Sequence, residues 1–180
     1  MTTCDLRVHF GKDDPDRDTS YAPVIAIFSV AFLMAAGLGW ASFGTPLTLR
    51  GLEWFIALSM CLLAVQKLTD VESFSTMFLN YDLLARRWVP YSYIYPFAEA
   101  LAGILMLAGA LIWIAAPVAV VIGTIGAVSV VKAVFVDGRQ LKCACIGGDS
   151  QVSLGVVSLT ENLMMLAMGV WMPLRIWLGL

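Results

Sequence analysis

Charged residues are scarce in this chain. They make up 13% of its 180 residues, against about 25% in an ordinary soluble domain. Hydrophobic residues supply 60%. The few basic side chains form no patch interleaved with aromatic residues, which excludes nucleic acid as a partner. This composition is typical of a membrane protein, so we expect the lipid bilayer to surround the chain.

Histidine and cysteine are also rare. The single histidine, His9, stands in a polar N-terminal segment. No Ser–His or Cys–His pair can therefore be placed among the apolar segments, and nothing indicates a hydrolase. The sequence does not decide whether the chain is an enzyme of another kind. The four cysteines are too few and too scattered for the disulfide framework of a small secreted protein; they are Cys4, Cys61, Cys143 and Cys145.

The chain begins without the positive n-region of a secretory signal, because residues 1–21 carry three basic and five acidic side chains. We expect these residues to form a polar tail. Residues 22–180 contain five apolar segments that are long enough to cross a bilayer as helices. These segments are 22–43, 52–68, 97–114, 118–136 and 159–178. Joined by short connections, they predict an all-α fold: a polytopic membrane bundle of about five transmembrane helices in one domain.

An amphipathic stretch follows the second apolar segment. Its apolar residues recur every three or four positions from Leu68 to Ala85, which predicts a helix on the membrane surface or a continuation of the second span. Pro90 and Pro96 are expected to end any helix beyond it, with Pro96 in the first turn of the third span. The aromatic residues here are typical of the lipid headgroup belt; they are Trp88, Tyr91, Tyr93 and Tyr95.

Two further signals predict where the last helices begin. Residues 115–117, Ala-Ala-Pro, are expected to form a tight turn between the third and fourth spans. Ser158 with Glu161 three positions later matches a capping box, which predicts that the last helix starts near Leu159.

Ionisable residues inside the apolar segments are costly, at about 2.5–3.5 kcal/mol each, so they normally face the bundle interior. Glu99 and Lys132 are the foremost examples. We expect Lys132 to pair with Glu99 or with Glu161, and Asn162 to be a hydrogen-bonding neighbour. An alternative interpretation places both glutamates at helix N-termini, where the helix dipole favours negative charge.

A short polar break, residues 142–149, separates the last two apolar segments and contains Cys143 and Cys145. A Cys-x-Cys pair can close a strained disulfide, or it can offer two thiolates to a soft metal ion such as Cu(I), Zn or Hg. Lys142 and Arg139 would favour the thiolate form. Alternatively, the two cysteines are incidental small residues in a loop.

Several stretches together carry a resemblance to a known family. They are Lys67-Leu68-Thr69-Asp70 with Phe78-Leu79-Asn80-Tyr81-Asp82-Leu83-Leu84, Tyr95-Pro96-Phe97-Ala98-Glu99, Lys142-Cys143-Ala144-Cys145-Ile146-Gly147-Gly148, and Ser158-Leu159-Thr160-Glu161-Asn162-Leu163. Over roughly residues 52–178 the chain resembles the MauE branch of the DoxX-like redox-associated membrane proteins, named for methylamine utilisation. The resemblance implies a four-helix core, to which residues 22–43 add one N-terminal helix.

The resemblance also implies a role in disulfide formation, in electron transfer, or in the maturation of partner proteins. Cys143 and Cys145 would be the redox pair. Where the family usually has Asp before the first cysteine this chain has Lys142, and where it often has Phe after the second this chain has Ile146. A related redox or metal-handling task therefore fits as well as methylamine utilisation itself.

These observations support two main hypotheses. The first is an integral membrane thiol-redox protein that needs no cofactor and exchanges with a thioredoxin-like partner. The alternative is a copper- or mercury-binding or transport protein, in which the same cysteines ligate Cu(I) or another soft ion delivered by a metal-carrier protein. A structural assembly factor with idle cysteines is a third option. The expected supporting residues are Lys142, Lys132, Glu99, Glu161 and Asn162.

Basic residues flank the apolar segments unequally. Nine lie on the side of the N-terminal tail and the Cys-x-Cys loop, whereas Arg50 and Arg175 lie on the other side. The positive-inside rule then predicts a bacterial inner-membrane protein with its N-terminus and Cys-x-Cys loop in the cytoplasm and its C-terminus outside.

Overall fold

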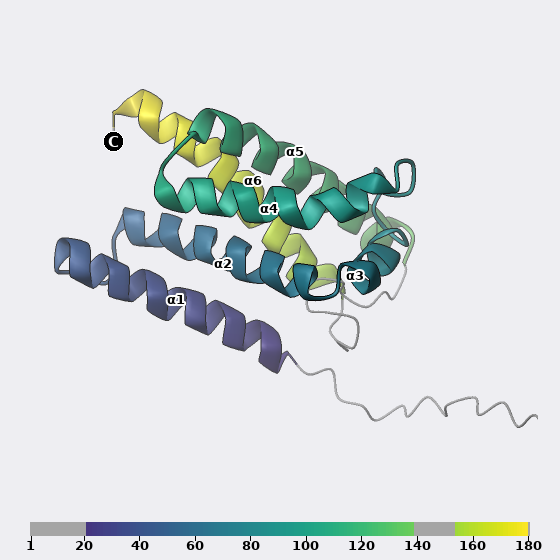
Figure 1. The fold of residues 1–180 in the computed structure, drawn as a ribbon, viewed down its shortest axis with the longest axis horizontal. Coiled ribbons are helices and arrows are strands. Elements are labelled where there is room, and N and C mark those ends of the chain that lie inside the picture. The colour runs from purple at the N-terminus through teal and green to yellow at the C-terminus, as the bar shows by residue number, and fades with distance from the viewer. Residues whose placement is uncertain (1–20, 139–153, 180) are drawn as a thin grey trace, which may run out of the picture.

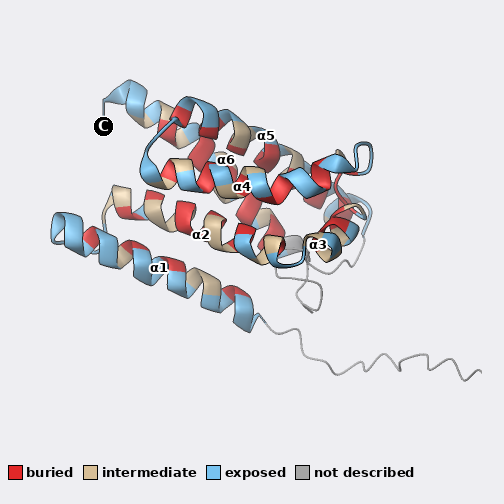
Figure 2. Cartoon of the chain, viewed as in Figure 1, coloured by how far each residue is buried: buried red, intermediate tan, exposed pale blue. Residues whose placement is uncertain are grey.

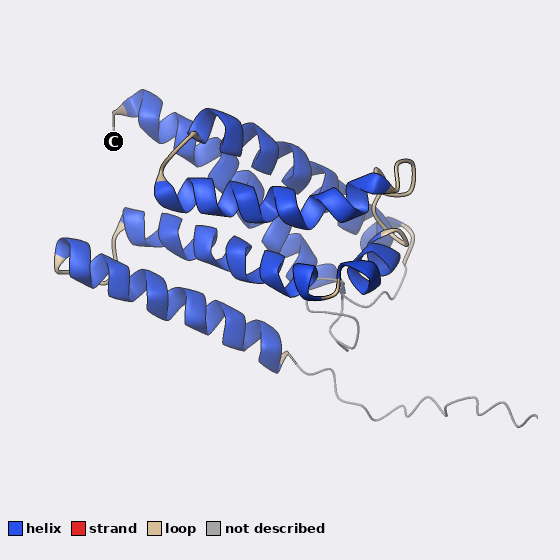
Figure 3. Cartoon of the chain, in the orientation of Figure 1, coloured by secondary structure: helices blue, strands red, loops and turns tan. Residues whose placement is uncertain are grey.

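The computed structural model describes residues 21–138 and 154–179, and these fold into a bundle of long helices without strands (Figures 1 and 3). The elements are α1 (Ala22–Phe43), α2 (Leu49–Thr69), α3 (Val71–Phe78), α4 (Pro90–Ala108), α5 (Ile112–Val131), the π-helical turn η1 (Lys132–Val136) and α6 (Leu154–Leu178). Five of them, with η1 continuing α5, are long and apolar enough to cross a membrane. The expected all-α polytopic bundle is confirmed.

The helices α2, α4, α5 and α6 form the core of the bundle. The closest packing joins α5 to α6, α2 to α4, and α4 to α5. Helix α1 lies along the outer side of α2, where Ala31 and Ala35 pack against Leu58 (Figure 1). Most of α1 is exposed, whereas the buried residues of the other helices face one another (Figure 2). Lipid would therefore cover most of α1.

The amphipathic helix α3 closes one end of the bundle. Its Asp70 N-cap accepts a hydrogen bond from the Ser73 backbone N–H at 2.9 Å. Its buried face carries Phe74 and Phe78, whose ring centroids lie 5.0 Å apart. Phe78 also lies 4.8 Å from the Tyr95 ring of α4. The period of three to four residues therefore marks a face that packs onto α4.

The aromatic residues expected in the headgroup belt divide between two environments. Trp88 and Tyr93 are exposed, as a belt requires. Tyr91 and Tyr95 are buried at 6% and 2% exposure, so the belt prediction is wrong for them. They belong to the same face of α4, which packs against α3, and their rings form part of the aromatic core at this end.

Several predicted helix boundaries are wrong because prolines lie inside helices. Helix α4 begins with Pro90 in its first turn, and Pro96 lies within it rather than at its start. Pro117 likewise lies within α5, and the preceding turn is made by Gly109 and Leu111, both with positive φ. Transmembrane helices tolerate proline because neighbouring groups satisfy the backbone groups it leaves unpaired.

The predicted capping box at the start of the last helix is also wrong. Helix α6 begins at Leu154, so Ser158 and Glu161 lie inside it. The Ser158 carbonyl accepts a hydrogen bond from the Asn162 side chain at 2.6 Å. Glu161 faces the interior of the bundle, where it has a different partner.

Candidate functional site: a buried lysine between two glutamates

A buried ion cluster joins three of the transmembrane helices. Lys67 comes from the last turn of α2, Glu99 from the middle of α4, and Glu161 from α6. The Lys67 Nζ donates to Glu99 Oε2 at 2.6 Å and also to Glu161 Oε1. Their exposed fractions are 1%, 0% and 2%. The lysine therefore bridges two carboxylates at a depth that solvent does not reach.

Aromatic rings complete the surroundings of the Lys67 ammonium. Its Nζ lies 5.2 Å from the centroid of the Tyr95 ring and 6.0 Å from that of Phe74. A cation within about 6 Å of an aromatic face is attracted by the ring quadrupole. The aromatic core at this end of the bundle thus also stabilises the buried positive charge.

The cluster contains more acceptors than the lysine can satisfy. With all three groups ionised it carries one excess negative charge, and buried charges are tolerated only when they are paired and hydrogen-bonded. Among the described residues, no donor reaches the buried Glu99 Oε1. The site can therefore take up one further hydrogen-bond donor or positive charge close to the Lys67–Glu99 pair.

Asn162 follows Glu161 in α6 and packs closely against α5. Its Oδ1 accepts from the Tyr95 hydroxyl at 3.4 Å. A Cβ atom at Gly126 would overlap that same Oδ1, and one at Gly123 would lie 2.9 Å from the Asn162 carbonyl oxygen. Close approach of the two helices therefore requires glycine at these positions of α5.

The predicted pairing of Lys132 with Glu99 or Glu161 is wrong, because Lys67 pairs with both carboxylates. Lys132 is exposed and begins η1 at the end of α5, whereas Glu99 is bound by Lys67. Lys67 stands near the end of an apolar segment, where its charge resembles an interfacial one. The sequence does contain a pattern that places Lys67 inside the bundle. Lys67 follows Met60, Leu63 and Ala64 at helical spacing, and these buried residues define the inward face of α2.

The alternative interpretation of the glutamates is also wrong. Glu99 lies well inside α4 and Glu161 inside α6, so neither is at a helix N-terminus. Both carboxylates instead pair with the Lys67 ammonium in the interior of the bundle.

The predicted redox residues Cys143 and Cys145, together with Lys142, lie outside the described residues. The chain leaves η1 near Gly138 and re-enters α6 at Leu154, and both points lie at the end of the bundle where α3 packs (Figure 1). The Lys67 cluster lies toward that same end. Within the described part of the chain, no three Cys, His, Asp or Glu side chains are grouped as metal ligands.

A buried aspartate, Asp82, lies at the same end, in the connection between α3 and α4. Asp82 Oδ1 accepts hydrogen bonds from the backbone N–H groups of Ala85 and Leu84 at 2.8 and 2.9 Å. The Leu83 N–H donates to Ser129 Oγ of α5 at 3.0 Å, which ties the connection to the core. Burial raises the pKa of the Asp82 carboxyl above its ordinary value, although the hydrogen bonds that it accepts from Ala85 and Leu84 oppose the shift.

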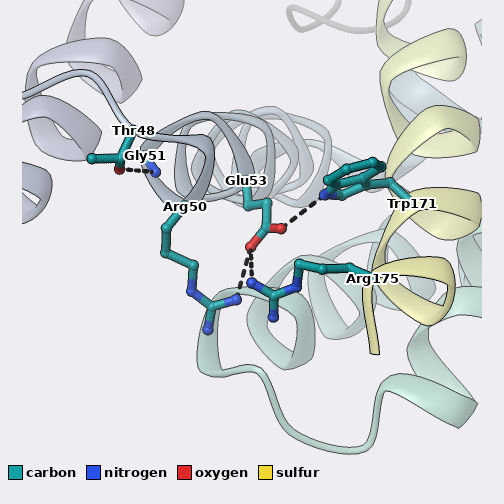
Figure 4. Close-up of polar contacts among 6 residues, drawn as sticks. All are labelled: Thr48, Arg50, Gly51, Glu53, Trp171 and Arg175. Atoms are coloured by element: carbon teal, nitrogen blue, oxygen red, sulfur yellow. Dashed lines mark hydrogen bonds and ion pairs between the residues drawn. The ribbon is translucent and has the colours of Figure 1, made fainter. Parts of the chain in front are cut away.

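A second polar cluster lies at the opposite end of the bundle. Glu53 of α2 is 3% exposed, and its Oε1 accepts from Trp171 Nε1 of α6 at 2.8 Å. Its Oε2 accepts from Arg50 at 2.7 Å and from Arg175 at 3.1 Å (Figure 4). The sequence showed the two arginines as flanking charges of α2 and α6, but not their convergence on one carboxylate.

Comparison with protein-family models finds a match over most of the chain. The family model described as Methylamine utilisation protein MauE matches residues 27–175. The match covers all of α2, α3, α4 and α5, most of α1 and α6, and all residues of both polar clusters. No curated protein and no solved structure shows a significant match to the chain.

Proposed function

The chain belongs to the MauE family of membrane proteins, and we propose that it acts within this family as a membrane thiol-redox protein whose reactive group is the Cys143–Cys145 pair. The observation that carries the proposal is the Cys-x-Cys pair itself, in a polar break between two spans of the matched region. The family description refers to methylamine utilisation. We therefore place the exchange in the maturation of partner proteins of that process.

The proposed step is thiol–disulfide exchange with a thioredoxin-like partner. One thiolate of the pair attacks the partner's disulfide and forms a mixed disulfide, releasing one partner thiol. The other cysteine then attacks its neighbour's sulfur, closes the Cys143–Cys145 disulfide and releases the second partner thiol. Two electrons and two protons pass from the pair to the partner. The strained ring of a Cys-x-Cys disulfide makes the reverse reaction accessible as well.

Neighbouring charges support this chemistry. Lys142 adjoins Cys143, and Arg139 lies four positions before it. Cations next to a cysteine favour the thiolate, which is the attacking species.

We further propose that the Cys-x-Cys end of the bundle faces the bacterial cytoplasm. Lys67 is buried and no longer counts as a flanking charge, but the exposed Arg86 and Arg87 remain at this end. Arg50 and Arg175, at the other end, are both paired with Glu53. The positive-inside rule therefore gives the same orientation as before.

The decisive experiment uses Cys143→Ser and Cys145→Ser variants in membranes under mild oxidation. Thiol exchange predicts that one of the two variants accumulates a mixed disulfide with a partner, visible on non-reducing gels and lost with reductant. Cys61→Ser is the matched control and should leave the adduct unchanged. Stoichiometric binding of Cu(I) or Hg(II) by the wild type, weakened in each variant and with no mixed disulfide, would instead establish the metal-binding alternative.

A further inference from the structure

We propose that the cluster around Glu53 and the groove beside it form a binding site for one anionic phospholipid. In this site the lipid phosphate contacts Arg50 and Arg175, and part of one acyl chain lies between α2 and α6. Neither the family match nor the proposed thiol exchange accounts for this end of the molecule.

The charge balance of the cluster favours an anion. Two guanidinium groups converge on the single carboxylate of Glu53, which leaves one excess positive charge (Figure 4). Each guanidinium has five N–H donors. The contacts to Glu53 use one nitrogen of each, and the buried Arg175 Nε has no hydrogen-bond partner among the described residues. Guanidinium groups match the geometry of phosphate oxygens, so these donors suit a phosphate.

The groove adjoins this cluster directly and is apolar. It has a volume of about 340 Å³. It is lined by Leu49, Leu52, Glu53 and Ile56 of α2 and by Ala167, Met168 and Trp171 of α6. This volume is near the lower limit for small-ligand pockets, about 300–1,000 Å³, so it suits part of an acyl chain rather than a whole lipid.

The position of the site selects a lipid over a soluble anion. Arg50 lies in the first turn of α2 and Arg175 in the last turn of α6, the depth at which headgroups meet the ends of transmembrane helices. Leu49 and Leu52 are 69% and 55% exposed, so the groove opens toward the lipid phase. Trp171, which lines the groove, points its indole N–H to Glu53, the arrangement of an interfacial tryptophan.

The test measures lipid retention. Full-length protein is delipidated in a mild detergent, given equal amounts of phosphatidylglycerol and phosphatidylcholine, and examined by native mass spectrometry. The wild type should retain phosphatidylglycerol about fivefold over phosphatidylcholine, which corresponds to about 1 kcal/mol for the one excess positive charge of the cluster. Arg50→Gln with Arg175→Gln should abolish this preference. The control, Arg86→Gln with Arg87→Gln, removes two exposed arginines at the opposite end and should preserve it.

A second pair of variants leaves the ion pairs intact and covers the case in which the arginine variant does not fold. Ala167→Phe fills the groove and should lower retention of phosphatidylglycerol, whereas Val170→Phe places the same new side chain at an exposed position of α6 outside the groove and should not. Excess glycerol phosphate should fail to displace the lipid. Equal retention of both lipids by the wild type, equal effects within either pair of variants, or displacement by glycerol phosphate would each overturn the proposal.

Discussion

Lys67 Nζ lies 2.6 Å from Glu99 Oε2, and this contact joins α2 to α4 where neither side chain is more than 1% exposed. Glu161 adds a third helix through the same ammonium. A single cation therefore holds together three of the four core helices. Its removal leaves carboxylates in surroundings where an uncompensated charge is expensive.

Lys67→Met should destabilise the bundle by about 3–5 kcal/mol, the usual cost of removing one partner of a buried ion pair. The measurement is unfolding of the purified protein in mixed micelles. Lys132→Met is the matched control, because Lys132 is exposed and should change stability by no more than about 0.5 kcal/mol. Equal effects of the two substitutions would show that the cluster does not stabilise the fold.

Replacing the whole cluster should reverse much of that loss. Lys67→Met combined with Glu99→Leu and Glu161→Leu leaves no unpaired charge, and apolar replacements of buried ion groups are often neutral or stabilising. If the cluster also tunes the thiols, the stable triple variant should form less mixed disulfide than the wild type. Recovery of stability together with full thiol exchange would restrict the cluster to a structural role.

Gly126→Ala should destabilise the packing of α5 against α6 by about 1–3 kcal/mol, because its Cβ would overlap Asn162 Oδ1. Gly37→Ala in α1 is the control: its Cβ would meet nothing within 4 Å, and alanine favours the helix by about 0.5–1 kcal/mol. Thermal unfolding of both variants gives the comparison. Asn162→Ser in the Gly126→Ala background should recover part of the loss, since it shortens the obstructing side chain.

Asp82 should give the stability of the bundle a measurable dependence on pH. Its folded pKa is raised by burial, so the native state holds the proton more tightly than the unfolded state. Its contribution to the free energy of unfolding is fully present below the unfolded pKa, about 3.9, and is lost as pH rises through the raised folded pKa. The measurement is the melting temperature as a function of pH. Asp82→Asn should make the melting temperature depend less on pH, whereas Asp70→Asn, at an exposed position, should leave the dependence unchanged. An unchanged slope in Asp82→Asn would contradict the assignment.

Orientation can be read from thiol labelling. A membrane-impermeant maleimide should leave Cys143 and Cys145 unmodified in intact cells and modify them once the membrane is opened, because flanking basic residues favour the cytoplasmic side. The labelled protein should carry Cys4→Ser and Cys61→Ser, so that Cys143 and Cys145 are the only thiols that the maleimide can modify. Labelling from outside would reverse the topology and place the pair in an oxidising compartment, where a resting disulfide is expected.

The sequence by itself determined the helical class, the number of spans and the family. Long apolar runs separated by polar breaks require helices in a bilayer, because every backbone group must be satisfied within its own segment. The first span, residues 22–43, was predicted with the bounds that α1 has. The spacing of Phe74 and Phe78 likewise predicted α3, since period alone defines an amphipathic face.

Tertiary structure decided which charges meet. Lys67 and Lys132 both lie near the end of an apolar segment, so the local sequence predicts the same free-energy cost of placing either charge in the membrane. Lys67 contacts Glu99 because of how α2 is oriented about its own axis in the bundle, whereas Lys132, at the end of α5, is exposed. The convergence of Arg50 and Arg175 on Glu53 likewise depends on α2 meeting α6, more than a hundred residues later. Ion pairs between distant helices are set by packing, which no local pattern encodes.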